Sequence, residues 1–265
     1  MEQKKTEILN SLLKELGSFV IAFSGGLDSS CLVYHASRIK NIRFTAVTIR
    51  TPYIPEREIN EAVEFASAHS ADHKIINISF PEEIRHNPED RCYLCKRRLF
   101  NHLICFAREN GFKYLVDGTN SDDTKEYRPG LRALRELEVR SPLAEAGLSK
   151  REIRELCKNA GLQIWDKPAM ACLLTRIPYN TEISDSIIRM IEAAEELMLT
   201  KGYPGARVRA HSGIARIELL PGHLEKIVTD PEKESIIAGL KRMGFKYISL
   251  DLEGYRTGSM NDELK

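Results

Sequence analysis

The sequence predicts an α/β fold, in which a doubly wound parallel sheet is followed by a smaller α+β domain. Between residues 19 and 116, short apolar runs alternate with segments of helical periodicity, as in parallel sheets covered by helices on both faces. The run at 19–23 is continuously hydrophobic, as expected of a strand buried on both faces. Beyond residue 182 the predicted order becomes helix, strand, strand, helix, strand. We therefore expect two domains, residues 1–181 and 182–265.

The elements of the first domain follow from the same periodicities. Strands are predicted at 19–23, 44–49, 73–78 and 113–116, and helices at 29–38, 56–69 and 93–110. An amphipathic N-terminal helix is predicted from apolar residues at helical spacing, namely Ile8, Leu9, Leu12, Leu13 and Leu16. In the helix at 56–69, the residues expected to face inward are Ile59, Val63 and Ala66. Cys31 and Cys157 lie on or near apolar stripes, so we expect them in the core.

The remaining segments carry weaker signals. Residues Arg140–Leu143 are predicted to form a short edge strand that ends at a proline, and Ser149–Glu152 has the pattern of a capping box. Arg128 precedes Pro129-Gly130, which places it on a loop, either facing a ligand or solvating the surface. Residues 161–181 show little periodicity but are too apolar for disorder, which predicts an active-site loop. In the second domain, helices are expected at 183–199 and 232–243, and strands at 206–211, 214–219 and 246–250.

A turn rich in glycine and serine connects the first strand to its helix. Glycines let backbone amides approach an anion, and the helix N-terminus behind them adds oriented N–H groups and partial positive charge. Serine hydroxyls add further donors. The predicted ligands of a phosphate group are Ser24, Gly25, Gly26, Ser29 and Ser30. The alternative is an ordinary strand-to-helix turn.

Asp28 lies inside this turn and restricts which ligands the turn can bind. A carboxylate would repel phosphates unless a metal ion lay between them, so we expect Mg²⁺ to bridge Asp28 and a pyrophosphate. The turn lacks the Lys-Ser/Thr end of a Walker A loop, and it lacks the G-x-G-x-x-G dinucleotide fingerprint.

Composition excludes several classes of function. The chain has 265 residues, 42% of them hydrophobic, which is enough for a sizeable core, and its net charge is +1. Near-neutral charge argues against nucleic-acid or membrane partners. No apolar run approaches the roughly 20 residues that span a bilayer, and the N-terminus has no signal-peptide pattern. We therefore expect a cytoplasmic protein whose six cysteines are reduced unless they bind metal.

The segment Ser24-Gly-Gly-Leu-Asp-Ser-Ser30 resembles the signature of the pyrophosphatase-loop ATPases, the adenine nucleotide α-hydrolase-like (HUP-type) superfamily. The resemblance implies an ATP-binding domain over residues 1–181. It also implies that ATP is cleaved between its α- and β-phosphates, that AMP joins a substrate oxygen, and that pyrophosphate leaves on the loop. The substrate is not defined by this segment alone.

Further segments, spread over nearly the whole chain, resemble the LarE family. They are Asn87-Pro-x-x-Arg-Cys-Tyr-x-Cys-Lys96, Asp117-Gly-Thr-Asn-x-Asp-Asp123, Tyr127-Arg-Pro-Gly-Leu-Arg132, Arg140-Ser-Pro-Leu-Ala-Glu-Ala-Gly147, Trp165-Asp-Lys-Pro-Ala-x-Ala-Cys172, Arg176-Ile-Pro-Tyr179 and Asp251-Leu-Glu-Gly-Tyr-Arg-x-Gly-Ser259. The resemblance implies an ATP-dependent sulfur transferase that acts on pyridinium-3,5-biscarboxylic acid mononucleotide and makes thiocarboxylates for the nickel-pincer cofactor of lactate racemase. Leu174-Thr175 departs from the family, in which small residues are expected before Arg176.

The resemblance leaves two sources of sulfur open. In the family, the cysteine that matches Cys172 can donate its own sulfur and become dehydroalanine. Alternatively, Cys92 and Cys95 form a C-x-x-C pair that could join Cys172 in holding a [4Fe–4S] cluster with one open iron. A zinc site or a dithiol/disulfide pair is a third possibility for these cysteines.

Other residues have less specific expectations. By resemblance, Arg207 and Arg209 bind the substrate's phosphate, although they could instead lie on a solvated strand face. Gly118 and Thr119, with Asp117, are expected to contact the nucleotide, and Asp123 to assist Mg²⁺. Lys96 could neutralise an anion or lie on a helix surface, and Trp165 could stack on a ring or serve in packing.

Two competing functions remain at this point. One is another pyrophosphatase-loop enzyme, either a tRNA thiolase or an amidating ligase resembling NAD synthetase. The other is a non-catalytic ATP sensor, against which Asp28 argues because a sensor need not hold a catalytic metal. For the favoured function the expected partners are a small nucleotide substrate and further copies of the chain, because the family tends to form homo-oligomers.

Overall fold

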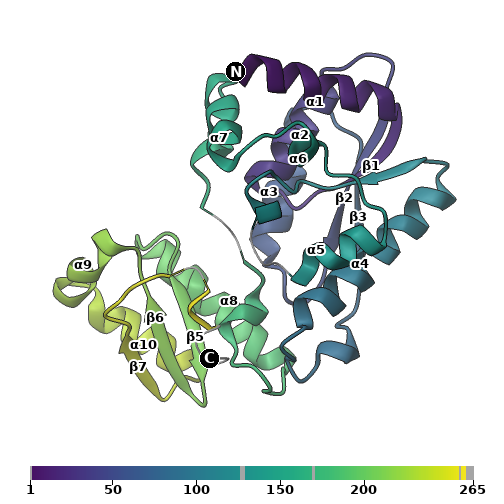
Figure 1. Ribbon diagram of the computed structural model, residues 1–265. Coiled ribbons are helices and arrows are strands. Elements are labelled where there is room, and N and C mark those ends of the chain that lie inside the picture. Colours follow the sequence, from purple (N-terminus) through teal and green to yellow (C-terminus); the bar gives the residue numbers. More distant parts are fainter. Residues whose placement is uncertain (1, 126–128, 169–170, 257, 261–265) are drawn as a thin grey trace. The chain divides into compact units, whose positions relative to one another are not determined.

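The protein forms two compact units in a computed structural model that describes residues 2–125, 129–168, 171–256 and 258–260 (Figure 1). The first unit comprises Met1–Pro81 and Asp90–Met170, and the second comprises Glu82–Glu89 and Ala171–Lys265. This division assigns the segment that carries Cys172 to the second unit, whereas Cys92 and Cys95 belong to the first. Among the described residues, no helix is long and apolar enough to cross a membrane.

A parallel sheet of four strands lies at the centre of the first unit, in the order β3-β2-β1-β4. The strands are β1 (Ser18–Ala22), β2 (Arg43–Arg50), β3 (His73–Asn77) and β4 (Tyr114–Val116). In the register, Ile21 of β1 pairs with Ala46 of β2 and with Val116 of β4. The predicted α/β class and parallel sheet are therefore confirmed, with each strand displaced by at most a residue or two.

Alternate residues of β1 enter separate clusters of buried side chains, which shows that both faces of the sheet are covered. Phe19 and Ile21 belong to a cluster with residues of α1 (Glu2–Leu16), α2 (Leu27–Ser37), α3 (Glu56–Ala68), α6 (Pro142–Glu145) and α7 (Lys150–Asn159). Val20 belongs to a second cluster with residues of α4 (Arg91–Glu109) and α5 (Pro129–Glu136). Cys31 and Cys157 are both buried in the first cluster, as predicted.

Some local predictions are wrong for physical reasons. Val63 is 39% exposed while Ala62 is buried, so the inward stripe of α3 is displaced by one residue. Ile8 of α1 is also exposed. Arg140 makes only an isolated bridge to Val116, because Pro142 occupies the first turn of α6, where its missing N–H costs nothing. Pro129 and Gly130 likewise begin α5, and Arg128 lies outside the described residues.

The predicted capping box at the start of α7 is present. The Ser149 N–H donates to Glu152 Oε2 at 2.9 Å, and the Glu152 N–H donates to Ser149 Oγ at 3.3 Å. Lys5 Nζ of α1 also donates to Glu152 Oε1 at 2.7 Å. These hydrogen bonds lower the pKa of Glu152 to about 2. The N-terminus of α7 is thereby fixed against α1, which positions the residues that follow Ser149.

The second unit contains a three-stranded sheet in the order β5-β6-β7. Strand β5 (Arg207–His211) is antiparallel to β6 (Ile214–Glu218), and β7 (Tyr247–Leu250) is parallel to β6. The helices are α8 (Asp185–Thr200), α10 (Lys233–Met243) and the short α9 (Leu224–Thr229), which the sequence did not predict. The 3₁₀ turns in the described part of the chain are η1 (Glu82–Ile84), η2 (Asp123–Lys125), η3 (Gln163–Asp166), η4 (Leu173–Arg176) and η5 (Pro221–His223).

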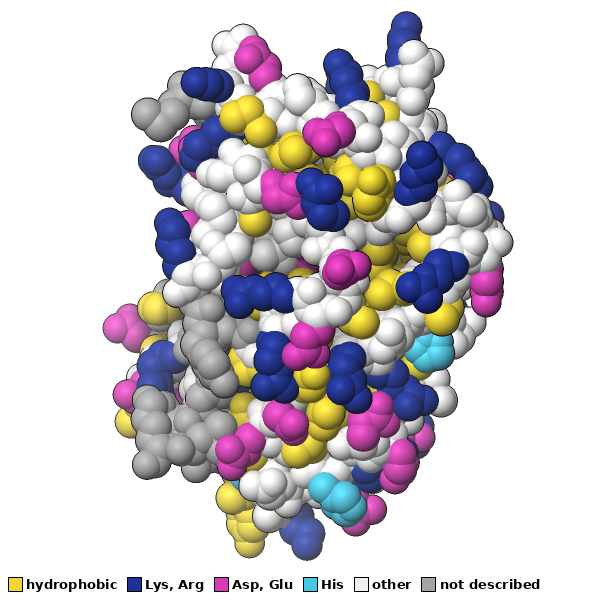
Figure 2. Space-filling view, turned by 45° about the vertical axis from the view of Figure 1, so that its right-hand side comes forward, with side chains coloured by type: hydrophobic (Ala, Val, Ile, Leu, Met, Phe, Trp, Pro, Cys, Tyr) yellow, Lys and Arg dark blue, Asp and Glu magenta, His cyan; other side chains and the backbone are white. Residues whose placement is uncertain are grey.

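Charged side chains of both signs are interspersed over the face shown in Figure 2. This distribution agrees with the net charge of +1.

Candidate functional site

The turn between β1 and α2 is built as a tight loop that only glycine permits at its centre. Gly25 has a φ of +68°, and a Cβ at this position would lie 2.9 Å from Cβ of Ala62. Ser24 Oγ accepts a hydrogen bond from the Gly26 N–H at 3.3 Å and lies 3.1 Å from Ser29 Oγ. Gly26 is the N-cap of α2, so the helix begins at Leu27, earlier than predicted, and Asp28 lies in its first turn.

The loop after β4 lies directly beside this turn. A Cβ added to Gly118 would be 2.8 Å from the backbone N of Ser29, so glycine is required for the close approach. Strands β1 and β4 are neighbours, and the chain leaves β1 in the opposite direction to reach β2. Parallel α/β sheets bind ligands at such a switch point, beyond the carboxyl ends of the strands. The turn and the Asp117–Thr119 loop therefore come together at this edge of the sheet.

Asp117 and Thr119 are bonded to each other in this loop. The Thr119 hydroxyl donates to Asp117 Oδ2 at 2.5 Å, and the Ser141 hydroxyl donates to Asp117 Oδ1 at 2.6 Å. Both residues are buried. Asp117 thus braces the loop from inside, and the contact of Thr119 with a nucleotide remains a prediction.

Asp28 has a donor on each carboxylate oxygen. The Asn120 side-chain amide donates to Oδ1 at 3.4 Å, and Lys150 Nζ forms an ion pair with Oδ2. Asp123 is connected to Asp28 through Asn120, because the Asp123 carboxylate accepts the backbone N–H of Asn120 at 3.1 Å. The sequence reasoning missed Lys150, which looked like an ordinary surface residue behind the capping serine.

The carboxylate of Asp28 is a ligand that suits Mg²⁺. This ion prefers oxygen ligands and is commonly held by one or two carboxylates together with substrate phosphates. The Asp28 side chain is 20% exposed, so one of its oxygens can reach a bound ion. Among the described residues, no group of three or more His, Cys, Asp or Glu side chains is arranged to hold a metal ion.

A second lysine contacts the turn from the other side. Lys167 Nζ donates to the carbonyl oxygen of Gly25 at 2.8 Å and pairs with Glu61 Oε2 at 2.5 Å. Arg154 supports this residue by donating to the Lys167 carbonyl oxygen at 3.1 Å. The only sequence signal for Lys167 was its place in the Trp165–Cys172 segment.

Two buried hydroxyls near this edge have no hydrogen-bond partner among the described residues: Ser30 Oγ and Thr51 Oγ1. Thr51 follows the end of β2, at the same carboxyl edge of the sheet. Ser30 is fully buried and its backbone N–H donates to the Gly26 carbonyl at 3.0 Å. The backbone of Ser30 therefore helps to hold the turn in place, and contact of its side chain with phosphate remains a prediction.

Cys92 and Cys95 lie in the first two turns of α4, three residues apart and hence on neighbouring positions of one helix face. Cys92 is exposed, and Cys95 is half-buried with its Sγ 3.1 Å from the Tyr53 hydroxyl. Tyr53 itself is buried. Two of the three predicted cluster ligands therefore belong to the first unit, and thiolates are the ligands that iron–sulfur clusters take.

Cys172 lies in the second unit, at the N-cap of η4. Its Sγ accepts the backbone N–H of Leu174 at 3.4 Å, and its carbonyl oxygen accepts the Thr175 hydroxyl at 2.8 Å. Arg176 Nη1 donates to the carbonyl oxygens of Ala171 and Cys172 at 2.8 and 3.2 Å. Leu174-Thr175, the departure from the family pattern, therefore contributes directly to the turn that carries the thiol.

Arg176 is fixed by a carboxylate of α8. Its Nε and Nη2 donate to the two carboxylate oxygens of Glu195, each at 2.8 Å. Arg176 is 1% exposed, so this bidentate pair is buried against the turn. The sequence offered no signal for Glu195.

Arg207 and Arg209 are both buried on one face of β5, so the alternative of a solvated strand face is wrong. Arg209 donates to both carboxylate oxygens of Glu218, at 3.0 and 2.6 Å, and to the Thr175 carbonyl at 2.9 Å. Arg207 donates to the Ala206 carbonyl at 3.1 Å and lies over the Tyr255 ring. Burial and the nearby charge of Arg176 lower the pKa of Arg207. Their binding of a substrate phosphate remains a prediction.

Trp165 and Lys96, the remaining two candidates, make local contacts within the first unit. Trp165 packs half-buried against the core cluster, with Lys158 Nζ 4.7 Å from the centre of its ring. Lys96 Nζ lies 5.6 Å from the ring centre of Phe100 on the same helix. These contacts favour the packing role of Trp165 and the helix-surface role of Lys96.

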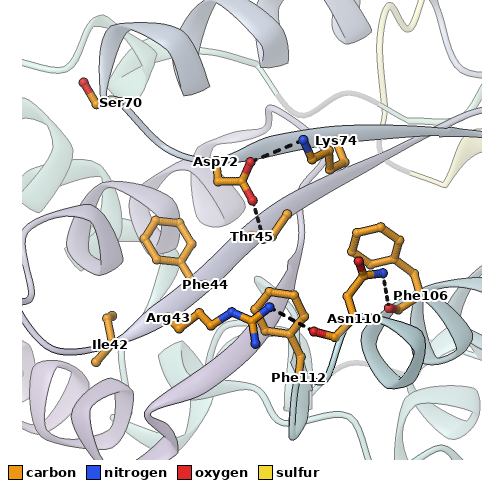
Figure 3. A pocket seen from close by; sticks show the side chains of 10 residues that line it. All are labelled: Ile42, Arg43, Phe44, Thr45, Ser70, Asp72, Lys74, Phe106, Asn110 and Phe112. Atoms are coloured by element: carbon orange, nitrogen blue, oxygen red, sulfur yellow. Dashed lines mark hydrogen bonds and ion pairs between the residues drawn. The ribbon is translucent and has the colours of Figure 1, made fainter.

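A hollow of about 490 Å³ lies at the opposite edge of the sheet, around the amino ends of β2 and β3 (Figure 3). Arg43 and Asp72 point into it, but both are engaged: Arg43 donates to the Asn110 carbonyl at 2.9 Å, and Asp72 accepts the Thr45 hydroxyl at 2.5 Å. It contains no residue that the sequence singled out. The candidate site therefore lies at the other edge, where Ser24–Ser30 and Asp117–Thr119 meet.

The chain is similar along its whole length to proteins from bacteria and archaea. It is 33% identical to the pyridinium-3,5-bisthiocarboxylic acid mononucleotide synthase of Lactiplantibacillus plantarum, over 98% of this chain and 95% of that protein. An uncharacterised protein of Synechocystis is 36% identical, over 98% of each chain. An uncharacterised protein of Methanocaldococcus jannaschii is 37% identical, over 96% of this chain and 98% of that protein.

No family model matches the chain. Among solved structures, that of NMN synthetase from Francisella tularensis covers 64% of this chain and 75% of its own, at 17% identity and a TM-score of 0.49.

Proposed function

The chain belongs to the LarE family of pyrophosphatase-loop enzymes, and from that membership we propose that it is an ATP-dependent sulfur transferase acting on pyridinium-3,5-biscarboxylic acid mononucleotide. It converts carboxylates of this nucleotide to thiocarboxylates for a nickel-pincer cofactor. The structural observation that carries the proposal is the Ser24–Ser30 turn, with Asp28 in the first turn of α2, beside Gly118 at the switch point of the sheet. This arrangement suits the pyrophosphate end of ATP.

The first step activates a carboxylate, which is a poor electrophile on its own. A carboxylate oxygen attacks the α-phosphorus, the bond from that phosphorus to the bridging oxygen breaks, and pyrophosphate leaves. The product is an acyl adenylate. The backbone N–H groups of the turn stabilise the charge that develops on the leaving group. Mg²⁺ held by Asp28 would supply further positive charge for that leaving group.

In the second step sulfur replaces AMP. If Cys172 is the donor, its thiolate attacks the acyl carbon, AMP leaves, and a thioester forms. Loss of the Cα proton then breaks the Cβ–S bond, which leaves the thiocarboxylate on the substrate and dehydroalanine at position 172. By this route each protein chain donates one sulfur atom and is then consumed.

The second source of sulfur is a [4Fe–4S] cluster. Cys92, Cys95 and Cys172 are the residues that would hold it, and the cluster would supply a sulfur that does not come from the protein. The hydrogen bond between Tyr53 and Cys95 would orient one of these thiolates. By this route Cys172 stays intact.

The activation step can be tested separately from sulfur transfer. Incubation with the biscarboxylic mononucleotide, ATP, Mg²⁺ and labelled pyrophosphate should give label in ATP, because adenylylation is reversible while AMP remains bound to the acyl group. The Asp28→Asn variant should show no exchange. Exchange that does not depend on the mononucleotide would contradict the proposed substrate.

A further inference from the structure

The ion pair between Lys150 and Asp28 occupies the acid that a metal ion would use. Lys150 Nζ pairs with Asp28 Oδ2, and Asn120 donates to Oδ1 at 3.4 Å. A divalent cation cannot share Oδ2 with an ammonium group without strong repulsion between the two positive charges. The Lys150 ammonium must therefore leave Oδ2 when a divalent cation binds there.

The backbone of Lys150 is fixed, so only its side chain can move. Its N–H donates to Asp122 Oδ2 at 2.9 Å, and the capping box begins at the residue before it. Ile153 and Cys157 bury the inner face of α7, and Lys5 joins this helix to α1 through Glu152. The Asp28 pair is therefore not needed to hold α7 in place. The Lys150 side chain is 35% exposed and has room to rotate.

The surroundings also determine where a displaced ammonium would go. Lys150 is the first residue of α7, at the positive end of that helix dipole, and Asp28 lies in the first turn of α2. Once Asp28 is neutralised by a metal ion, the ammonium has lost its counter-charge at this position. The phosphate oxygens of a ligand in the Ser24–Ser30 turn would restore it.

We propose that Lys150 is a positioning residue that exchanges partners: it holds Asp28 in the metal-free protein and moves to the pyrophosphate oxygens when Mg²⁺ takes the carboxylate. It supplies from α7 the cation that this loop lacks, in contrast to loops that carry their own lysine. The inference rests on the proposed use of Mg²⁺ and ATP and does not depend on sulfur transfer.

The Lys150→Met variant tests the exchange through binding alone. Binding of Mn²⁺ without nucleotide, followed by electron paramagnetic resonance, should become about three- to tenfold tighter, because the competing ammonium is gone. Binding of inorganic pyrophosphate with Mg²⁺, measured by calorimetry, should become about tenfold weaker. Lys150→Arg should restore most of the pyrophosphate affinity.

Two further variants complete the design. Lys158→Met removes an exposed lysine from the same helix and should leave both affinities unchanged. Asp28→Asn should lose Mn²⁺ binding, and retained binding would overturn both the metal assignment and the exchange. If Asp28→Asn loses Mn²⁺ but Lys150→Met binds it no more tightly than wild type, the exchange alone is refuted. Unchanged pyrophosphate affinity in Lys150→Met would refute the move to phosphate.

Discussion

Nη1 of Arg176 lies 3.2 Å from the carbonyl oxygen of Cys172, and Nε of the same guanidinium lies 2.8 Å from Glu195 Oε1. One buried side chain thus connects the backbone of the cysteine turn to α8. The proposed sulfur chemistry needs a thiol held in a defined position. Arg176 supplies this by donating a hydrogen bond to the backbone carbonyl oxygen of Cys172.

Breaking the Arg176–Glu195 pair should destabilise the second unit. Arg176→Met removes the guanidinium from the Glu195 carboxylate, which keeps the Val208 N–H as a hydrogen-bond donor, and we expect a loss of about 3–5 kcal/mol in the free energy of unfolding. Urea denaturation followed by far-UV circular dichroism measures this loss. Fluorescence of Trp165, the only tryptophan, reports on the first unit and should shift less.

The double variant Arg176→Met/Glu195→Met is the control for this prediction. Replacing both members of a buried pair with apolar residues is less costly than removing one. The double variant should therefore be more stable than Arg176→Met. Wild-type stability in the single variant would show that the pair does not hold the turn.

The Gly25→Ala substitution should impair ATP binding. The new Cβ would lie 2.9 Å from Ala62 Cβ, and the φ of +68° costs a non-glycine residue roughly 1–2 kcal/mol. We expect ATP affinity to fall at least about tenfold, as measured by calorimetry. Adding Ala62→Gly removes the closest contact but leaves the Cα and N of residue 62 at 3.1 and 3.2 Å from the new Cβ, and it does not relieve the backbone strain, so it should restore only part of the affinity. Full affinity in the single variant would be incompatible with the geometry of this turn.

The Glu152 carboxylate should make stability depend on acid pH. Hydrogen bonds from Lys5 and Ser149 lower its pKa from 4.5 to about 2 in the folded protein. Its contribution is therefore fully present above about pH 4.5 and is lost as the pH falls toward about 2. Glu152→Gln should lose stability less steeply over that range than wild type. Glu155→Gln, an exposed position on the same helix, should follow the wild-type profile.

The cysteines of α4 allow a matched test of the cluster route. Anaerobically purified or reconstituted protein should contain iron and sulfide, and Cys92→Ser or Cys95→Ser should lose them. Cys105→Ser removes an exposed cysteine of the same helix and should keep them. Iron and sulfide at wild-type levels in Cys95→Ser would exclude this residue as a ligand.

Absence of iron and sulfide from the wild-type protein under these conditions would favour Cys172 as the donor. Intact mass spectrometry after one reaction should then show a chain lighter by one H₂S, with dehydroalanine at position 172. An unchanged mass after several sulfur transfers would exclude the sacrificial route.

Features encoded by adjacent residues could be predicted from the sequence. The apolar run of β1 and the glycines after it gave the strand, the turn and its place at the sheet edge. The capping box was predicted because Ser149 and Glu152 act on each other within one helical turn. Val63 was assigned wrongly because helical spacing tolerates a shift of one position, and Ala62 is small enough to take the inward place.

Contacts between distant residues could not be predicted in this way. Lys150 and Asp28 are 122 positions apart, and Lys167 and Gly25 are 142 apart, so no periodicity connects them. Arg209 was predicted to bind a phosphate, but its buried partner Glu218 became visible only when β5 and β6 were paired. The sequence predicted which residues carry the chemistry of the site, and the fold shows which partners those side chains have.

We propose that the chain activates a carboxylate with ATP and replaces its oxygen with sulfur. Mass spectrometry of pyridinium-3,5-biscarboxylic acid mononucleotide after incubation with the protein, ATP and Mg²⁺ tests it most directly. We predict a thiocarboxylate product, with one AMP and one pyrophosphate released for each sulfur inserted, and no product with Asp28→Asn. An unchanged mononucleotide, or ADP and phosphate in place of AMP and pyrophosphate, would contradict the account.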